Sequence, residues 1–216
     1  MSSQTNFQNN VFPLGMPQGI ASLTVQSLSA NQANPLQIDQ SGRLLVTEEG
    51  LKPTYRAGGA GLTFYSTAAA VLLEIQGSAT KTVRVKKIVL WGQAGTKFYT
   101  EIEMLRSTGL SGSGSPNVAS IGVHDVSDPV ATAVVNYYTG AATYGTGHAL
   151  MGARYMGVMA PAATNIALPI VWDFCTNNDK PLILRGTGDV IQLYNTILTL
   201  GTATFGFEVE WEEDNS

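Results

Sequence analysis

The chain has 216 residues, of which 44% are hydrophobic and 13% are charged, and its net charge is −4. A typical soluble domain carries roughly 25% charged residues, and since nucleic-acid-binding domains are usually basic, the acidic balance argues against that class. The single cysteine, Cys175, excludes an intrachain disulfide framework. No apolar run approaches the roughly 18 residues of a membrane span, and no secretory signal is visible. We therefore expect a chain that is made and folded in a cytoplasm.

Residues 1–38 contain no charged side chain. Spaced apolar residues run through this segment: Phe7, Val11, Phe12, Leu14 and Met16. Prolines at 13, 17 and 35 interrupt any helical or alternating period. Disordered tails usually carry charge, so two interpretations stay open: a plain disordered tail, or an extended arm whose apolar residues bind another surface.

Two further segments set the expected domain boundary. Asp39–Thr47 reads as a turn at Ser41 and Gly42 followed by a short apolar strand, and 48–61 reads as a glycine-rich linker. The sequence thus predicts an extended arm and linker over 1–61, and one compact domain over 62–216.

Alternation with a period of two predicts the strands of this domain. The last strand, 204–213, places on its buried face Phe205, Phe207, Val209 and Trp211, and on its wet face Glu208, Glu210 and Glu212. The strand at 81–91 places inward Val83, Val85, Val89 and Trp91, and outward Arg84 and Lys86. The strand at 97–105 places inward Phe98, Ile102 and Met104, and outward Glu101 and Glu103. Charged outer faces on neighbouring strands can pair, at roughly 0.2–1 kcal/mol each.

The remaining segments complete an all-β pattern. Further strands are expected at 62–66, 71–76, 131–138, 166–174, 181–186 and 190–200. Residues 109–116 read as a flexible surface loop, and 186–188 as a tight hairpin turn rather than a phosphate-binding loop. A helix is conceivable only at 148–159, where two glycines disfavour it. Eight to ten short strands predict a sandwich or a barrel.

Several of these segments resemble virion proteins of tailed bacteriophages. They are GSATKTVRVKKIVLWG (77–92), IVWDF (170–174), PLILRGTGDVIQL (181–193) and FEVEWEE (207–213), with PLQIDQSGRLLVT (35–47) similar to the segment that precedes the β-domain in such proteins. In size and β-content the chain is most similar to a capsid decoration, or cement, protein. Residues 1–34 lie outside the resemblance.

The resemblance implies a fold and a role. The fold would be a jelly-roll-like β-sandwich preceded by an extended arm, assembled as a homotrimer on the outer surface of the capsid. The partner would be the major capsid protein, whose neighbouring capsomers it would bridge without catalysis or a cofactor. The arm residues Phe7, Val11, Phe12, Leu14 and Met16 are then candidate capsid contacts.

A group of tyrosines and one arginine are candidate subunit contacts: Tyr137, Tyr138, Arg154 and Tyr155. Tyrosine and arginine suit such interfaces. A tyrosine-rich surface, which would include Tyr144, can equally bind a sugar or a receptor.

Other polar residues favour structural roles. His124, Asp125 and Asp128 precede Pro129, where turn formers are common, and they lack the ligand set of a metal site. His148 reads as a loop residue. No serine lies on a strained turn suited to a nucleophile. We expect Cys175 to act as a small hydrophobe, and Asp173 either points outward or pairs with an arginine.

Two other functions stay open. The chain could be a head-fibre, tail or baseplate component that binds a host glycan. It could also be a carbohydrate-active β-sandwich enzyme, which needs two carboxylates about 5–9.5 Å apart across a cleft. The regular alternation of the glutamates on strands favours a solvated sheet face instead.

Overall fold

The computed structural model describes residues 37–38, 44–45, 52–64, 68–158, 165–175, 180–196 and 203–215. The chain divides into two units, Met1–Glu49 and Gly50–Ser216. In the first unit, β1 (Gln37–Ile38) pairs antiparallel with β2 (Leu44–Leu45). The candidate arm contacts Phe7, Val11, Phe12, Leu14 and Met16 lie outside the described residues.

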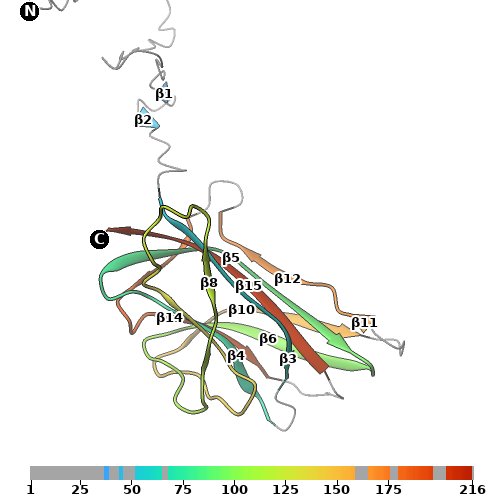
Figure 1. Cartoon of the computed structure of the whole chain (residues 1–216). Coiled ribbons are helices and arrows are strands. Elements are labelled where there is room, and N and C mark those ends of the chain that lie inside the picture. Colours follow the sequence, from blue (N-terminus) through green and yellow to red (C-terminus); the bar gives the residue numbers. More distant parts are fainter. Residues whose placement is uncertain are drawn as a thin grey trace, which may run out of the picture. The chain divides into compact units, whose positions relative to one another are not determined.

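The second unit is built from antiparallel strands that form two sheets packed face to face (Figure 1). The strands are β3 (Thr54–Thr63), β4 (Ala70–Gln76), β5 (Lys81–Ala94), β6 (Phe98–Ser107), β7 (Asn117–Val118), β8 (Ile121–Val123), β9 (Val134–Tyr137), β10 (Ala149–Val158), β11 (Asn165–Ile166), β12 (Ile170–Asp173), β13 (Leu182–Arg185), β14 (Val190–Asn195) and β15 (Ala203–Asn215). None of the described residues is helical, so the described part of the chain contains no helix that could cross a membrane.

The six-stranded sheet has the order β10-β6-β14-β4-β9-β7. The seven-stranded sheet has the order β11-β5-β15-β3-β8, with β12 and β13 also paired to β5. The expected all-β sandwich is thereby confirmed. Three antiparallel pairs are nested along the chain: β6 and β10 lie between β5 and β13 in sequence, and these in turn lie between β4 and β14. Strand β15 pairs with β5 on its other side, and β3 pairs with β15. The nested pairs are compatible with a jelly roll, which stays a prediction.

The core lies between the two sheets and is aromatic at its centre. Its largest fully buried side chains include Tyr55, Phe98, Phe205, Phe207 and Trp211. Tyr55 and Trp211 stack with ring centroids 5.7 Å apart. The alternation predicted for β15 and for β6 is confirmed, because the expected apolar residues of both strands are buried.

The alternation predicted for β5 is wrong beyond Lys86. Opposite β15 the register shifts, since Trp211 pairs with Val85 and Glu210 pairs with Lys87, which leaves Lys86 as a bulge. A bulge adds one residue and reverses the faces that follow. The buried residues after it are therefore Ile88 and Leu90.

Val89 and Trp91, which were expected inward, accordingly lie on the outer face and are half-buried. Trp91 is paired with Gly206 of β15. A Cβ atom on Gly206 would overlap the indole ring, so glycine at this position is what lets the tryptophan lie flat on the sheet.

Glycine-rich sequence hides two strands. Residues 148–159, the one conceivable helix, contain the ten-residue strand β10. Residues 54–61, expected within the linker, join the start of the strand expected at 62–66 to form β3 between β15 and β8. The compact unit accordingly begins at Gly50 rather than at Leu62.

The turn after β13 is a corner and not the expected hairpin, because β13 and β14 belong to different sheets. Gly186 has φ +75°, a left-handed conformation that favours glycine. Both carboxylate oxygens of Asp189 accept hydrogen bonds from Arg106, at 3.0 and 2.7 Å, and Arg106 also donates to the carbonyl of Ile183 at 2.8 Å. This pair holds the corner.

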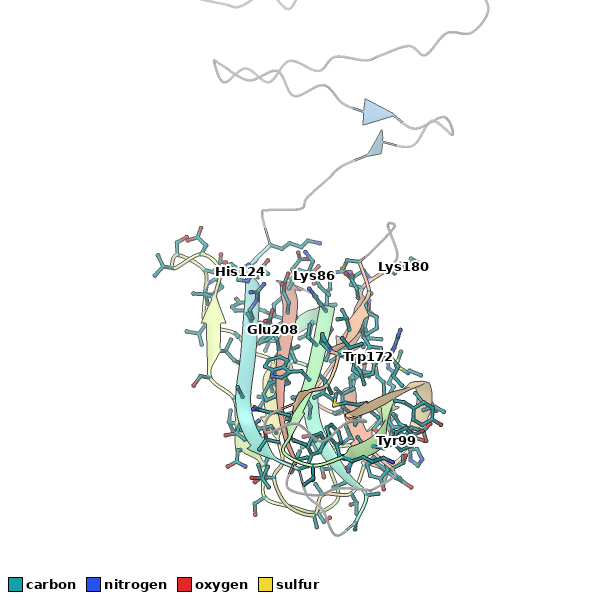
Figure 2. All side chains as sticks on the ribbon, turned by 90° about the vertical axis from the view of Figure 1, so that its right-hand side faces the viewer. Lys86, Tyr99, His124, Trp172, Lys180 and Glu208 are labelled. Atoms are coloured by element: carbon teal, nitrogen blue, oxygen red, sulfur yellow. The ribbon has the colours of Figure 1, made fainter. Side chains whose placement is uncertain are left out.

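The outer face of the seven-stranded sheet is a ladder of ion pairs. Figure 2 looks onto this sheet, on which Lys86 and Glu208 are labelled. Lys86 contacts Glu212 at 2.8 Å, and the same face holds the pairs Arg84–Asp214 at 2.9 Å and Arg56–Glu210 at 2.7 Å. The expected pairing of charged faces therefore occurs between β5 and β15 and between β3 and β15.

Candidate interaction surface

One edge of the six-stranded sheet gathers exposed large side chains. The edge strand β10 carries Leu150, Met151 and Tyr155, which are 59%, 41% and 60% exposed. Tyr155 stacks on Tyr99 of the neighbouring strand β6, with ring centroids 5.3 Å apart and planes 11° from parallel. Tyr99 is labelled at the lower right of Figure 2.

The charges at this edge are few. Glu101 of β6 is paired directly with Tyr155 of β10, and the negative charge of Glu101 raises the pKa of the Tyr155 phenol. Arg154 is exposed and makes no ion pair with any described residue. The edge is thus mainly apolar and aromatic, with one cation available for a partner.

A second aromatic group lies further along the same sheet. Tyr144 packs edge-on against Tyr194 of β14, with centroids 5.0 Å apart, and its other neighbour is His148 at 4.2 Å. His148, expected in a loop, precedes β10 directly. Burial raises the pKa of Tyr194, with the nearby Tyr144 and Glu103 adding to the shift.

Two of the four candidate subunit contacts are occupied within the chain. Tyr138 is buried, and its hydroxyl donates to Glu74 at 3.2 Å. Burial, aided by the charge of Glu74, raises the pKa of Tyr138 to about 12. Tyr137 is half-buried and packs on Phe207. Of the predicted set, Arg154 and Tyr155 are exposed, and as consecutive residues of β10 they point to opposite faces of the sheet.

Glu74 is buried on β4, yet each of its oxygens accepts two hydrogen bonds. One oxygen accepts from the Asn136 amide at 3.1 Å and from Tyr138. The other accepts from the backbone N–H of Ser111 and from the Gln192 amide, both at 2.7 Å. None of these donors carries a formal charge. Four donors replace the water that burial removes, so the carboxylate is saturated.

The Glu74 network anchors the loops that cover β4 and β14. The Gln192 carbonyl oxygen accepts from the Ser107 hydroxyl and from the backbone N–H of Gly145, both at 2.9 Å. Ser111 also donates its hydroxyl to the carbonyl of Thr143 at 2.6 Å. Residues 109–116, expected to be a flexible loop, are therefore tied to the sheet and to the 139–147 segment.

Glu213 is the second buried carboxylate, on the core face of β15. It accepts hydrogen bonds from the backbone N–H groups of Thr132 and Ala133 at 2.9 and 2.8 Å, from the Thr132 hydroxyl at 2.6 Å and from the Trp211 indole at 3.1 Å. The Lys81 ammonium lies 3.7 Å away. Burial acts to raise the pKa of Glu213, but the hydrogen bonds outweigh it and leave the pKa lowered.

Tyr55 lies beside this carboxylate at the same end of the core. Its hydroxyl donates to the carbonyl of Pro129 at 2.8 Å. Burial raises the pKa of Tyr55 to about 12, and the charges of Glu213 and Asp128 add to the shift. Neither Glu74 nor Glu213 is exposed, so both carboxylates serve to join segments of the fold.

The other polar candidates have structural environments. Asp125 accepts from the backbone N–H and the hydroxyl of Ser127, at 2.8 and 2.7 Å, as expected of a turn. No group of three or more His, Cys, Asp or Glu side chains that could hold a metal ion occurs among the described residues. Asp173 points outward, and its carboxylate accepts from the N–H of the half-buried Cys175.

The strand glutamates lie on two different faces. Glu101 and Glu103 are on the outer face of the six-stranded sheet, whereas Glu208, Glu210 and Glu212 are on the outer face of the other sheet. The sandwich separates the two groups, so they do not face each other across a cleft.

Sequence reasoning missed three important residues. Tyr99 alternates with Glu101 and could have been placed outward by the same period that placed Phe98 inward. Glu213 has the parity of Trp211 and Val209, so the same period of two could have placed it on the buried face. Glu74 gave no such signal, because β4 is buried on both faces and its cover comes from loops distant in sequence.

The comparisons with known proteins leave the family open. No protein-family model matches the chain, and a search of curated proteins also finds no match. The resemblance to phage virion proteins therefore rests on the sequence segments alone.

Proposed function

We propose that this chain is a structural virion protein that binds the outer surface of a phage capsid. It would bridge neighbouring capsomers of the major capsid protein through the charge-free segment 1–38. Phe7, Val11, Phe12, Leu14 and Met16 would contact the grooves between capsid subunits. Linking several weak contacts through one assembly raises avidity by roughly 10²–10⁴.

The observation that carries the proposal is how the sandwich uses its polar groups. The two buried carboxylates, Glu74 and Glu213, are saturated by hydrogen bonds that fasten loops and strands. Among the exposed large side chains, Tyr99, Leu150, Met151 and Tyr155 lie at one edge, on β6 and β10, while others such as Val126 and Leu168 lie singly elsewhere. A rigid body with an apolar edge and an uncharged extension suits attachment better than chemistry.

The decisive measurement is the number of copies per purified particle, by quantitative mass spectrometry against the major capsid protein. Hundreds of copies in simple ratio to the capsid protein would support the proposal. A dozen or fewer would assign the chain to a fibre or tail, and absence from particles would overturn both assignments.

A truncation tests the role of the arm. A chain that lacks residues 1–34 should keep the circular dichroism spectrum of the intact protein, because the compact unit begins at Gly50. It should no longer co-sediment with capsids. Undiminished co-sedimentation would refute the arm while leaving the particle location open.

A glycan-binding component of a head fibre, tail or baseplate is the second candidate. The observation that favours it is the exposed Tyr99–Tyr155 stack beside Glu101, since aromatic rings with a nearby hydrogen-bonding group suit sugars. Binding to a panel of host surface glycans that Tyr155→Ala abolishes would support this alternative.

A further inference from the structure

Among the described strands, β10 is the long free edge of the molecule. It ends the six-stranded sheet and pairs with β6 over its whole length from Ala149 to Val158. On its other side no described strand is paired, so its backbone N–H and C=O groups on that side are free of ladder partners. Such an edge is a template for pairing with another chain.

The other described edges are shorter, and the part of β3 that runs past β8, residues 58–63, is rich in glycine. β7 has two residues and β8 has three, and β8 runs into a turn that carries Asp125 and Asp128. On the far side of β5 the edge is divided into β11, β12 and β13, of two, four and four residues. Shortness and charge are the usual devices that prevent edge pairing.

The strand β10 lacks most of these devices. Its one charged side chain is Arg154, and it contains neither lysine nor proline. A bulge at Met151 interrupts the register with β6, but from Gly152 to Val158 the register is regular. Leu150, Met151 and Tyr155 are exposed along it, so pairing this edge would also remove apolar surface from water.

We propose that β10 pairs antiparallel with β10 of a second copy of this chain, across a two-fold axis. Length is the first reason, because no other described edge could match β10 residue for residue. Charge is the second reason. Two copies of β10 bring together only two charges, and the antiparallel register that matches the strands over their full length opposes Arg154 to Ala153 and not to the second Arg154. Identical strands that pair about a two-fold form a closed, self-complementary contact.

The contact joins the two six-stranded sheets into one sheet that runs through both copies. It closes at two chains, whereas the resemblance to cement proteins implies three, so the mass in solution distinguishes the two arrangements. The inference does not depend on capsid binding and stands or falls separately from it.

The test uses the full chain in solution. Sedimentation equilibrium over a range of concentrations should give a mass of two chains. Ala153→Lys, at an exposed β10 position, should weaken association by about tenfold or more, because it adds like charges beside Arg154 on both sides. The matched control is Val118→Lys on the short edge β7, where Val118 is 68% exposed; this variant should associate like the parent.

Amide hydrogen exchange provides a readout that needs no variant. Peptides from 149–158 should exchange more slowly at concentrations where the protein is paired than where it is dissociated, while peptides from β7 and β8 should not change. A monomer at all concentrations would overturn the proposal. So would an oligomer, trimeric or otherwise, in which Ala153→Lys has no effect and β10 exchange is independent of concentration.

Discussion

The two sheets of the sandwich differ in what lies on their outer faces. The outer face of the seven-stranded sheet carries ion pairs such as Lys86–Glu212. The six-stranded sheet covers β4 and β14 with loops, which the buried Glu74 fastens, and leaves tyrosines exposed toward β10. Ion pairs at a solvated face contribute little stability. Removing the buried carboxylate would leave four donors without an acceptor, and each buried unsatisfied donor is costly.

The largest expected effect is at Glu74. Glu74→Leu removes the acceptor for four donors and should lower the free energy of unfolding by about 3 kcal/mol or more, since each buried unsatisfied donor costs about 1–3 kcal/mol. Urea denaturation measures this. The 109–116 loop should also become sensitive to proteolysis, because the tether at Ser111 is lost. Glu103→Leu, on the outer face of β6, is the control, and an equal loss there would break the comparison between covered and open positions.

Glu213 sharpens the comparison, because it is a buried carboxylate with a cation nearby. Glu213→Gln places an amide N–H against the N–H groups of Thr132 and Ala133 and should cost about 1–3 kcal/mol at neutral pH. The lowered pKa of Glu213 means that the unfolded chain binds this proton more readily. The stabilisation is therefore present above the unfolded pKa of about 4.3 and is lost as the pH falls through the folded pKa.

The pH dependence separates this residue from the rest. Denaturation at a series of pH values between neutral and strongly acidic should show a smaller acid-side slope for Glu213→Gln than for the parent. Part of the slope should remain, because the pKa of Asp214 is also lowered: burial acts to raise it, and the hydrogen bonds and charges of Arg84 and Lys52 together outweigh that effect. An unchanged slope would show that Glu213 does not titrate differently on unfolding.

The open face should respond weakly. Glu212→Gln breaks the 2.8 Å pair with Lys86 and should cost no more than about 1 kcal/mol. The difference from the parent should shrink at high salt, because both side chains are partly exposed and their charges are screened. A loss that persists in about 1 M salt would mean that the pair is less accessible to ions than its position suggests.

The smallest effect on stability is expected at the exposed aromatic stack. Tyr155→Ala should change the free energy of unfolding by about 0.5 kcal/mol or less, as most surface substitutions do. Thermal or urea denaturation of the dilute protein, below its self-association range, measures this. A loss of free energy of unfolding as large as that at Glu74 would show that Tyr155 stabilises the sheet, and would argue against a role in binding a partner.

The sequence predicted most reliably where alternation was uninterrupted. In β15 and β6 the period of two alone placed Phe205, Trp211 and Phe98 in the core. In β5 it failed after Lys86, because the bulge arises from the register with β15. The sequence of one strand does not specify the strand it pairs with or the register of that pairing. The glycines of β3 and β10 argued against regular structure, but neighbouring strands overrode that local preference.

The polar interior was the least predictable part. The glutamates that the period assigned to a wet face, such as Glu208, do lie there, whereas the buried Glu213 and Glu74 received no assignment. What decides their environment is the approach of Thr132 to β15 and of Ser111 to β4, and both contacts join residues far apart in the sequence. The corner at Gly186 was likewise identified as a turn, while its role as a crossing between sheets required the strand order.

The pairing of the first and last strands of the compact unit has a mechanical consequence. Thr54, at the start of β3, pairs with Glu212 near the end of β15, so the two ends leave the sandwich side by side from adjacent antiparallel strands. Tension applied between them would peel the β3–β15 ladder one residue pair at a time instead of shearing all its hydrogen bonds together. A pull delivered through both ends would thus open the sheet at low force.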